Sequence, residues 1–271
     1  MNQSSTEAEV VIVRGGGLGD FLLSLPLLYQ AVKRYDTVHL FTRTQYFQLL
    51  VEAIDKRIQV YDLDASIPAL KAMSKGRDVV SFWNDPEWIE ELEEAGAKKT
   101  KALNPRPQNS EHFVLSYFNE LQWEVDRYIF SHSWLSDRWN PKNQTLWIHP
   151  GSGSREKNAP IDSFLKRACA WLEKKQSHRV VFSFGEADLA LLSEIKSSPL
   201  AEHARCTCYE ISCLKEFLNC LASEAGCFLG NDSGPTHMAA MLGIPTEAIF
   251  ICTDASIWKP LGPRVKLLRG E

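Results

Sequence analysis

The stretch Phe228-Leu-Gly-Asn-Asp-Ser-Gly-Pro-Thr-His-Met-Ala-Ala-Met-Leu-Gly-Ile-Pro245 predicts a strand, a tight turn and a helix in immediate succession. Its short apolar run stops at the Gly-Asn-Asp-Ser-Gly-Pro turn, and an Ala, Met and Leu pattern of helical type follows. Asn231, Asp232 and Ser233 favour turns and N-caps, while Gly234 lets the backbone approach a ligand. Such a turn directs N–H groups and the positive end of a helix dipole at one point, which favours a phosphate or diphosphate. The alternative is an ordinary βα turn with good caps.

Strand-like runs alternate with helical patterns along the rest of the chain, which predicts parallel α/β layers. The expected strands are residues 9–14, 37–42, 57–63, 78–83 and 145–149, and the run that begins at Val180. The expected helices are residues 21–34, 45–54, 68–74, 87–95 and 112–123, and the helix that leads to Lys175. The polar residues 131–144 are typical of a linker, so the pattern indicates two domains.

Composition excludes several classes of protein. The chain has 271 residues and a net charge of −4, so it has no overall basic field that would attract nucleic acid. No apolar run reaches the roughly 20 residues that span a bilayer. Residues 1–9 are polar and acidic, unlike a signal peptide. The seven cysteines include no C-x-x-C pair, so we expect reduced thiols in a cytoplasmic protein and no metal site.

A glycine-rich segment, Gly15-Gly-Gly-Leu-Gly-Asp20, separates the first expected strand from its helix. Asp20 occupies the place of the third glycine in G-x-G-x-x-G, and the lysine of the Walker A pattern is missing. The glycines therefore indicate close approach of a substrate to the backbone. Asp20 is either a simple N-cap or a functional carboxylate at the start of the helix.

Two further strand ends in the second half lead into polar loops. In Pro150-Gly-Ser-Gly-Ser-Arg-Glu-Lys-Asn-Ala-Pro160, Gly and Ser supply N–H donors, while Arg155 and Lys157 supply positive charge. The polar positions of the second loop are Gly185, Glu186 and Asp188. Together with the Asn-Asp-Ser-Gly turn, these loops would form one side of a nucleotide-binding cleft.

Several segments match one known signature. Residues 231–245 fill every fixed position of N-D-[ST]-G-x-x-H-x-A-A-x-x-G-x-P, and residues 149–160 match H-P-G-S-x-x-x-x-K-x-W-P except for Ala159 at the tryptophan position. Residues 11–26 are similar to the opening strand, G-D and proline, and residues 253–262 to T-D-P-x-x-W-x-P-x-G, with Ala255 in place of proline. In these segments the chain resembles glycosyltransferase family 9, the ADP-heptose:lipopolysaccharide heptosyltransferases.

The resemblance implies a GT-B-like fold, in which two Rossmann-like α/β domains with parallel sheets face a cleft. The expected domains are residues 1–135 on the acceptor side and residues 145–271, which bind the nucleotide sugar. By resemblance, Asp20 is the general base and Lys157 neutralises the leaving phosphate. The implied donor-binding residues are Ser152, Gly185, Glu186, Asp188, Asp232, Ser233, Gly234 and His237, and the implied acceptor-side residues are Gly17 and Gly19. Which of Glu186 and Asp188 contacts the ribose stays open.

The implied function is inverting, metal-independent transfer of a sugar, expected to be heptose, from an ADP-sugar to a lipopolysaccharide-core or related glycan acceptor. We expect no cofactor and no nucleic acid partner, and a location in the cytoplasm or at the cytoplasmic face of the inner membrane. Two alternatives stay open: a family-9-like transferase with a different donor, and a nucleotide-sugar-binding protein with impaired catalysis. The second is favoured by Ala159 and by the end of the chain at Glu271, where the family normally adds a C-terminal helix.

Overall fold

The computed structural model describes residues 8–49, 55–108, 111–135 and 139–269. The chain forms two compact units, each built around one parallel sheet. The first unit comprises the chain up to Gly16 together with Leu23–Val125, and the second comprises Gly17–Leu22 together with the chain from Asp126 onward. Two parallel-sheet α/β units confirm the predicted fold class. Residues 17–22 and 126–135, which the sequence analysis placed in the first domain, group with the second unit.

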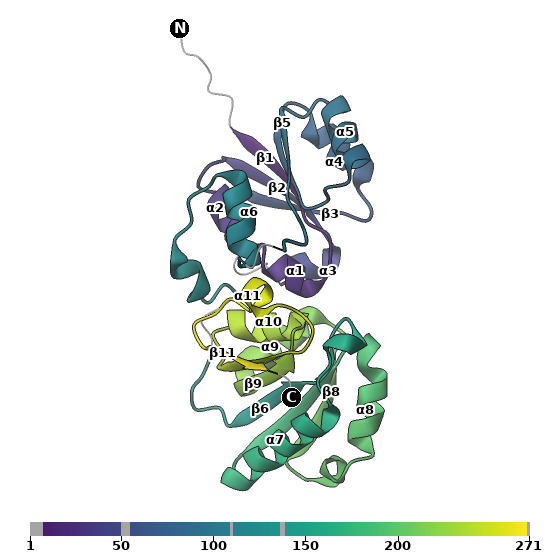
Figure 1. Ribbon diagram of the computed structural model, residues 1–271, viewed down its shortest axis with the longest axis vertical. Helices are drawn as coiled ribbons and strands as arrows, with labels where there is room; N and C mark the ends of the chain where they lie inside the picture. The colour runs from purple at the N-terminus through teal and green to yellow at the C-terminus, as the bar shows by residue number, and fades with distance from the viewer. Residues whose placement is uncertain (1–7, 50–54, 109–110, 136–138, 270–271) are drawn as a thin grey trace. The chain divides into compact units, whose positions relative to one another are not determined.

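The first sheet has five parallel strands in the order β3-β2-β1-β4-β5. Their bounds are β1 (Glu9–Val13), β2 (Thr37–Thr42), β3 (Ile58–Asp62), β4 (Asp78–Ser81) and β5 (Lys99–Ala102). Residues 10–13 of the central strand are fully buried, because helices cover both faces of the sheet. Figure 1 shows α2 and α6 on one face and α4 and α5 on the other.

The helices of the first unit are α2 (Leu25–Ala31), α3 (Thr44–Phe47), α4 (Ile67–Ser74), α5 (Pro86–Glu94) and α6 (Phe113–Leu121). On one face of the sheet, Val11, Phe41 and Val79 pack with Leu70 of α4 and Leu92 of α5. On the other face, Phe82 packs against Phe113 and Tyr117 of α6. The alternation of strand and helix predicted from the sequence therefore builds a three-layered unit.

The prediction of one continuous helix over residues 21–34 is wrong. The structure has two helices, α1 (Leu18–Leu22) and α2, which begins after the N-cap Ser24. Pro26 lies in the first turn of α2, where its missing N–H is tolerated, whereas it would break a helix that continued through it. Of the expected helix over residues 45–54, the structure shows α3, and residues 50–54 lie outside the described residues.

The second sheet has six parallel strands in the order β11-β10-β9-β6-β7-β8. Their bounds are β6 (Thr145–His149), β7 (Arg179–Phe184), β8 (Cys206–Glu210), β9 (Ala225–Asn231), β10 (Thr246–Phe250) and β11 (Val265–Arg269). The order runs outward in both directions from β6 and β9, as in doubly wound folds that bind nucleotides.

Helices cover both faces of the second sheet as well. From Asp126 onward, the helices of this unit are α7 (Ile161–Lys174), α8 (Leu189–Lys196), α9 (Leu214–Glu224), α10 (Gly234–Met241) and α11 (Ala255–Trp258). The same part of the chain contains short 3-10 turns: η1 (Arg127–Phe130), η2 (Arg155–Lys157), η3 (Glu186–Asp188) and η4 (Pro199–Glu202). Ile148 and Phe182 pack with Phe164 of α7 and Ile195 of α8. On the opposite face, Trp147 packs against Phe217 of α9.

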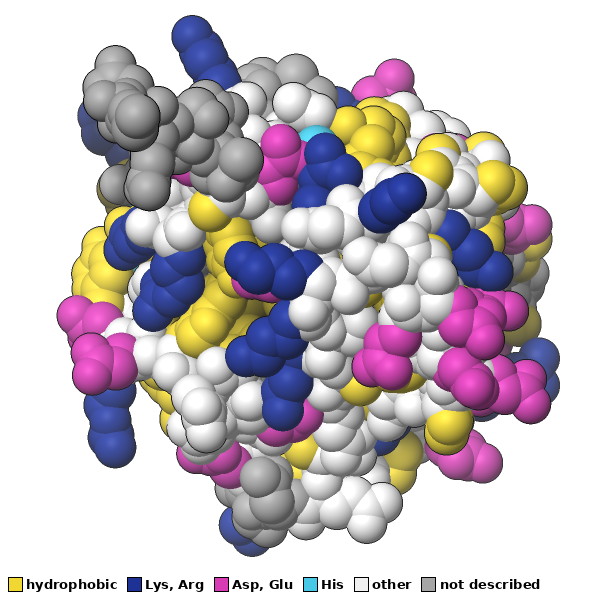
Figure 2. Space-filling model, turned by 90° about the horizontal axis from the view of Figure 1, so that it is seen from above, with side chains coloured by type: hydrophobic (Ala, Val, Ile, Leu, Met, Phe, Trp, Pro, Cys, Tyr) yellow, Lys and Arg dark blue, Asp and Glu magenta, His cyan; other side chains and the backbone are white. Residues whose placement is uncertain are grey.

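The surface carries charges of both signs. Figure 2 shows Lys and Arg side chains interspersed with Asp and Glu over the visible face, in keeping with the net charge of −4. Within the described part of the chain, no helix has the length and apolar character needed to cross a bilayer.

Candidate functional site

The carboxyl ends of β6 and β9 lie side by side at the centre of the second sheet. His149, the last residue of β6, pairs with Gly230 of β9, so the loop after β6 and the turn after β9 leave the sheet together. The strand order reverses between these two strands. In open α/β sheets, ligands bind at the carboxyl edge where such a reversal opens a crevice. The topology therefore selects this edge as the candidate site.

Asn231 fixes the loop after β6 to the end of β9. Its side chain is fully buried, and its Nδ2 donates to Pro150 O (2.7 Å) while its Oδ1 accepts from Ala159 N (3.0 Å). These bonds hold both ends of the loop that contains Lys157. Ala159, which replaces the family tryptophan, is buried, and its backbone is held by Asn231.

Asp232 is the centre of a cluster of polar side chains. Its side chain is only 7% exposed, and its Oδ2 accepts from Lys157 Nζ (2.8 Å) and from Thr253 Oγ1 (2.8 Å). His237 Nε2 lies 3.6 Å from the other carboxylate oxygen, Oδ1. Burial raises the pKa of Asp232, but His237 and Lys157 outweigh that effect and hold the pKa well below its usual range. Asp232 is therefore ionised at neutral pH, and three other segments of the chain converge on it.

The turn after Asp232 starts α10, with Ser233 as its N-cap residue. Ser233 Oγ contacts Thr236 Oγ1 (3.0 Å), and Thr236 Oγ1 donates to Asn231 O (2.6 Å), so the hydroxyl groups are bonded inside the turn. The first backbone N–H groups of a helix have no acceptor within it. The turn thus offers N–H donors and a helix dipole next to the Lys157 ammonium group, a combination that suits an anion.

Helix α1 packs against α10 within the second unit. A Cβ atom built on Gly19 would lie 3.3 Å from His237 Cδ2, and one built on Gly234 would lie 2.7 Å from Leu18 Cβ, so only glycine allows the approach at position 234. Asp20, on α1, accepts a hydrogen bond from Gly17 N at 2.9 Å from its Oδ2. The close packing therefore brings the helix that carries Asp20 to the start of α10.

His237 lies under this contact and is 3% exposed. Its Nε2 faces Asp232, and its buried Nδ1 has no hydrogen-bond partner among the residues that the structure describes. An orphaned polar atom of this kind is uncommon in a folded protein and points to a partner from outside the chain or to a functional role.

Asp188 connects the loop after β7 to the loop after β6. Its Oδ2 accepts from Gly185 N (2.9 Å) and lies 3.5 Å from His149 Nε2. A Cβ atom on Gly151 would fall 2.0 Å from Asp188 Oδ1, so the backbone of the first loop passes directly over the carboxylate. Glu186, in contrast, is exposed. The Asp188 carboxylate is thus buried and already bonded within the protein, whereas the exposed Glu186 side chain is accessible to a ligand.

The remaining predicted site residue, Ser152, stabilises its own loop. Its Oγ contacts Ser154 O (2.6 Å) and Asn158 Oδ1 (2.7 Å). Sequence analysis did not single out Asn231 or Thr253 as individual site residues. One feature of the sequence could have identified both residues: each stands at or just after the end of an expected or neighbouring strand. Asn231 ends β9, and Thr253 follows β10.

No metal centre is evident in the described residues, because no three or more His, Cys, Asp or Glu side chains are grouped to hold an ion. All seven cysteines are free thiols. Burial raises the pKa of Cys206 and of Cys227 to about 12, so these two thiols are protonated at neutral pH.

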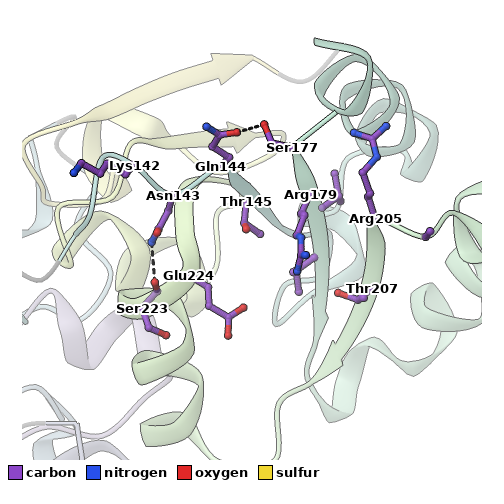
Figure 3. A pocket seen from close by; sticks show the side chains of 13 residues that line it. Lys142, Asn143, Gln144, Thr145, Ser177, Arg179, Arg205, Thr207, Ser223 and Glu224 are labelled. Atoms are coloured by element: carbon purple, nitrogen blue, oxygen red, sulfur yellow. Dashed lines mark hydrogen bonds between the residues drawn. The ribbon is translucent and has the colours of Figure 1, made fainter. Parts of the chain in front are cut away.

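A hollow of about 580 Å³ lies at the opposite, amino edge of the second sheet (Figure 3). Many of its polar groups are bonded within the protein. Gln144 Oε1 accepts from Ser177 Oγ, Asn143 Nδ2 donates to Ser223 O (2.8 Å), and Arg205 Nη1 lies within 3.2 Å of four main-chain carbonyl oxygens. The hollow is also at the wrong edge for the ligands of doubly wound sheets. We therefore place the candidate site at the carboxyl edge.

The two parallel-sheet α/β units, together with the solved structures that match them, define a GT-B-like protein. The sequence profile described as glycosyltransferase family 9 (heptosyltransferase) matches residues 114–271, which is more than half of the chain. The chain belongs to glycosyltransferase family 9. No curated protein sequence matches it significantly.

Solved structures of the same fold cover nearly the whole chain. A glycosyl transferase family 9 protein from Veillonella parvula is 16% identical, with a TM-score of 0.76 over 99% of this chain and 89% of that one. ADP-heptose lps heptosyltransferase II of E. coli is 13% identical (TM-score 0.75; 96% and 90% covered). The E. coli heptosyltransferase WaaC, solved with ADP, is 12% identical (TM-score 0.72; 96% and 93% covered).

The burial of His149 predicts a pH-dependent stability. Burial lowers the pKa of His149 from its ordinary value of 6.5, an effect that the Asp188 carboxylate only partly offsets. Below pH 6.5 the unfolded chain therefore binds a proton that the folded chain resists, so stability present above this pH is lost as the pH falls. In chemical denaturation at pH 7.5, 6.5 and 5.5, the wild type should lose more stability than His149→Asn, by on the order of 1 kcal/mol. Parallel losses in the two proteins would contradict this prediction.

Proposed function

We propose that the chain transfers a sugar, with heptose as the expected group, from an ADP-sugar to a lipopolysaccharide-core or related glycan acceptor, inverting the anomeric centre. The observation that carries this proposal is the Lys157–Asp232 pair at the start of α10, where the order of the second sheet reverses. Membership of glycosyltransferase family 9 supports the transferase class. Two similar solved proteins are heptosyltransferases by name, and one of them was solved with ADP.

The donor diphosphate is assigned to the turn between β9 and α10. The Lys157 side chain is 32% exposed, so its ammonium group can meet a ligand while it stays near Asp232. The backbone N–H groups of Ser233 and Gly234 add donors, and the dipole of α10 favours negative charge at its start. Groups fixed before the reaction stabilise a leaving group without reorganisation, which is the largest contribution in many enzymes. We assign the leaving-group charge to these groups and to no metal ion.

The acceptor hydroxyl attacks the anomeric carbon from the face opposite the diphosphate. The new carbon–oxygen bond to the acceptor forms as the bond to the diphosphate oxygen breaks, and Asp20 takes the hydroxyl proton. Its place on α1, which packs against α10, supports this role. Gly17 and Gly19 belong to the same segment and keep their proposed place on the acceptor side.

The nucleoside is assigned to the loop after β7. Because Asp188 is bonded to Gly185 and faces His149, Glu186 is the carboxylate that we propose for the ribose hydroxyls. Ser152, in the neighbouring loop, borders the same region. A lipid-linked glycan acceptor would place the reaction at the cytoplasmic face of the inner membrane, and this location belongs to the proposal. We propose no cofactor besides these two substrates, the donor and the acceptor.

The Asp20→Asn variant tests whether Asp20 is the general base of the transfer reaction. An amide can still accept the Gly17 N–H but cannot take a proton, so the variant should fold normally, bind ADP like the wild type and lose about 10²- to 10⁴-fold in kcat. The assay follows release of ADP and the glycosylated product from ADP-heptose and lipopolysaccharide-core acceptor, with Asp64→Asn, an exposed carboxylate of the first unit, as the control. Full turnover by Asp20→Asn would remove Asp20 as the base. A wild type that binds ADP yet forms no product would refute the transferase proposal in favour of a binding protein.

Lys157→Ala tests stabilisation of the leaving group. Loss of the ammonium group should slow transfer by about 10²-fold or more, because negative charge on the diphosphate grows as its bond to the sugar breaks. The measurement is kcat under saturating donor. Lys166→Ala, which removes an exposed lysine of α7, should keep the wild-type rate. Equal rates for the two variants would return Lys157 to the status of a surface charge.

A further inference from the structure

Thr253 reaches the candidate site from the strand next to β9. It follows β10 by three residues and donates from Oγ1 to Asp232 Oδ2 at 2.8 Å. The same oxygen accepts from Lys157 Nζ at 2.8 Å. One carboxylate oxygen therefore joins a hydroxyl group of fixed position to the flexible lysine that we assign to the leaving phosphate.

The backbone beside this contact is held rigidly. Asp232 N donates to Ile249 O (3.0 Å), which continues the pairing of β9 with β10 to the end of the sheet. The terminal torsion of an aspartate side chain has a broad, roughly two-fold profile, so the backbone alone does not set the plane of its carboxylate. The hydroxyl of Thr253, a β-branched residue with few rotamers, supplies the missing constraint. Oδ1 makes no comparably short contact with His237, whose Nε2 is 3.6 Å away.

We propose that Thr253 is a positioning residue for the transfer reaction: its hydroxyl sets the plane of the Asp232 carboxylate, and the carboxylate in turn holds the Lys157 ammonium group where the departing diphosphate develops its charge. The inference rests on the proposed function, since it takes Lys157 as the group that stabilises the leaving phosphate. We assign Thr253 no contact with the substrate or the reacting atoms, since the bond that carries its role is to Asp232.

The strength of the effect follows from the bond that is lost. A hydrogen bond to a charged group contributes more than one between neutral groups, and its loss is expected to reduce kcat about tenfold. Charge is retained, because Lys157 and Asp232 still form their pair, so binding of ADP should change much less than kcat.

The experiment is a double-mutant cycle with a rescue variant. Wild type, Thr253→Val, Thr253→Ser, Lys157→Ala and the Thr253→Val/Lys157→Ala double variant are compared by kcat and by the Kd of ADP. Valine keeps the shape of threonine without the hydroxyl group, and serine keeps the hydroxyl group. Ser256→Ala is the matched control: its hydroxyl group donates to Asp254 Oδ1, on the carboxylate that caps α11, and its loss should leave kcat at the wild-type value.

We expect Thr253→Val to lose about tenfold in kcat, Thr253→Ser to restore most of it, and Thr253→Val to cause no further loss once Lys157 is alanine. A hydroxyl group that only stabilised its loop would cause the same loss in both backgrounds, and that result would overturn the inference. Equal kcat values for Thr253→Val and wild type would also overturn the inference. If Lys157→Ala is slow in the same experiment, the proposed function stands although the inference about Thr253 fails. A Lys157→Ala enzyme with the wild-type rate would instead contradict the role of Lys157 on which the inference depends.

Discussion

A buried, ionised carboxylate at the end of β9 requires positive and hydrogen-bonding partners around it, and this requirement organises the carboxyl edge of the second sheet. The Asp232 carboxylate contacts Lys157 in the loop after β6, Thr253 in the loop after β10 and His237 in α10. An unpaired charge in that position would cost several kcal/mol, so the loops are held in one arrangement by the need to satisfy it. The Lys157 ammonium group is thereby held beside the residue that precedes the N-cap of α10.

The sheet topology explains why these partners come from separate parts of the sequence. β6 and β9 are neighbours although more than 70 residues separate them, and the carboxyl ends of parallel strands open on the same edge. Asn231 and Asp188 then tie the loop after β6 to β9 on one side and to the loop after β7 on the other. The packing of α1 on α10 adds a segment from the beginning of the chain, with Asp20, to the same unit.

The local sequence pattern predicted most of the strands and helices. It missed the features that depend on tertiary contacts. The β-branched runs predicted β2 and β6 with the bounds that the structure shows, because such residues suit buried parallel strands. The break between α1 and α2 was missed, since an apolar pattern continued through Pro26. The sequence could not choose between Glu186 and Asp188, because the burial of Asp188 depends on His149 and Gly151, which are distant in the chain. The contact of Thr253 with Asp232 was hidden for the same reason.

The most direct test of the diphosphate site is a crystal structure of the protein with ADP bound. The account predicts that the terminal phosphate lies within hydrogen-bonding distance of Lys157 Nζ and of the backbone N–H groups of Ser233 and Gly234, with the ribose beside Glu186. A diphosphate bound elsewhere, such as in the hollow at the amino edge beside Arg179, would contradict it.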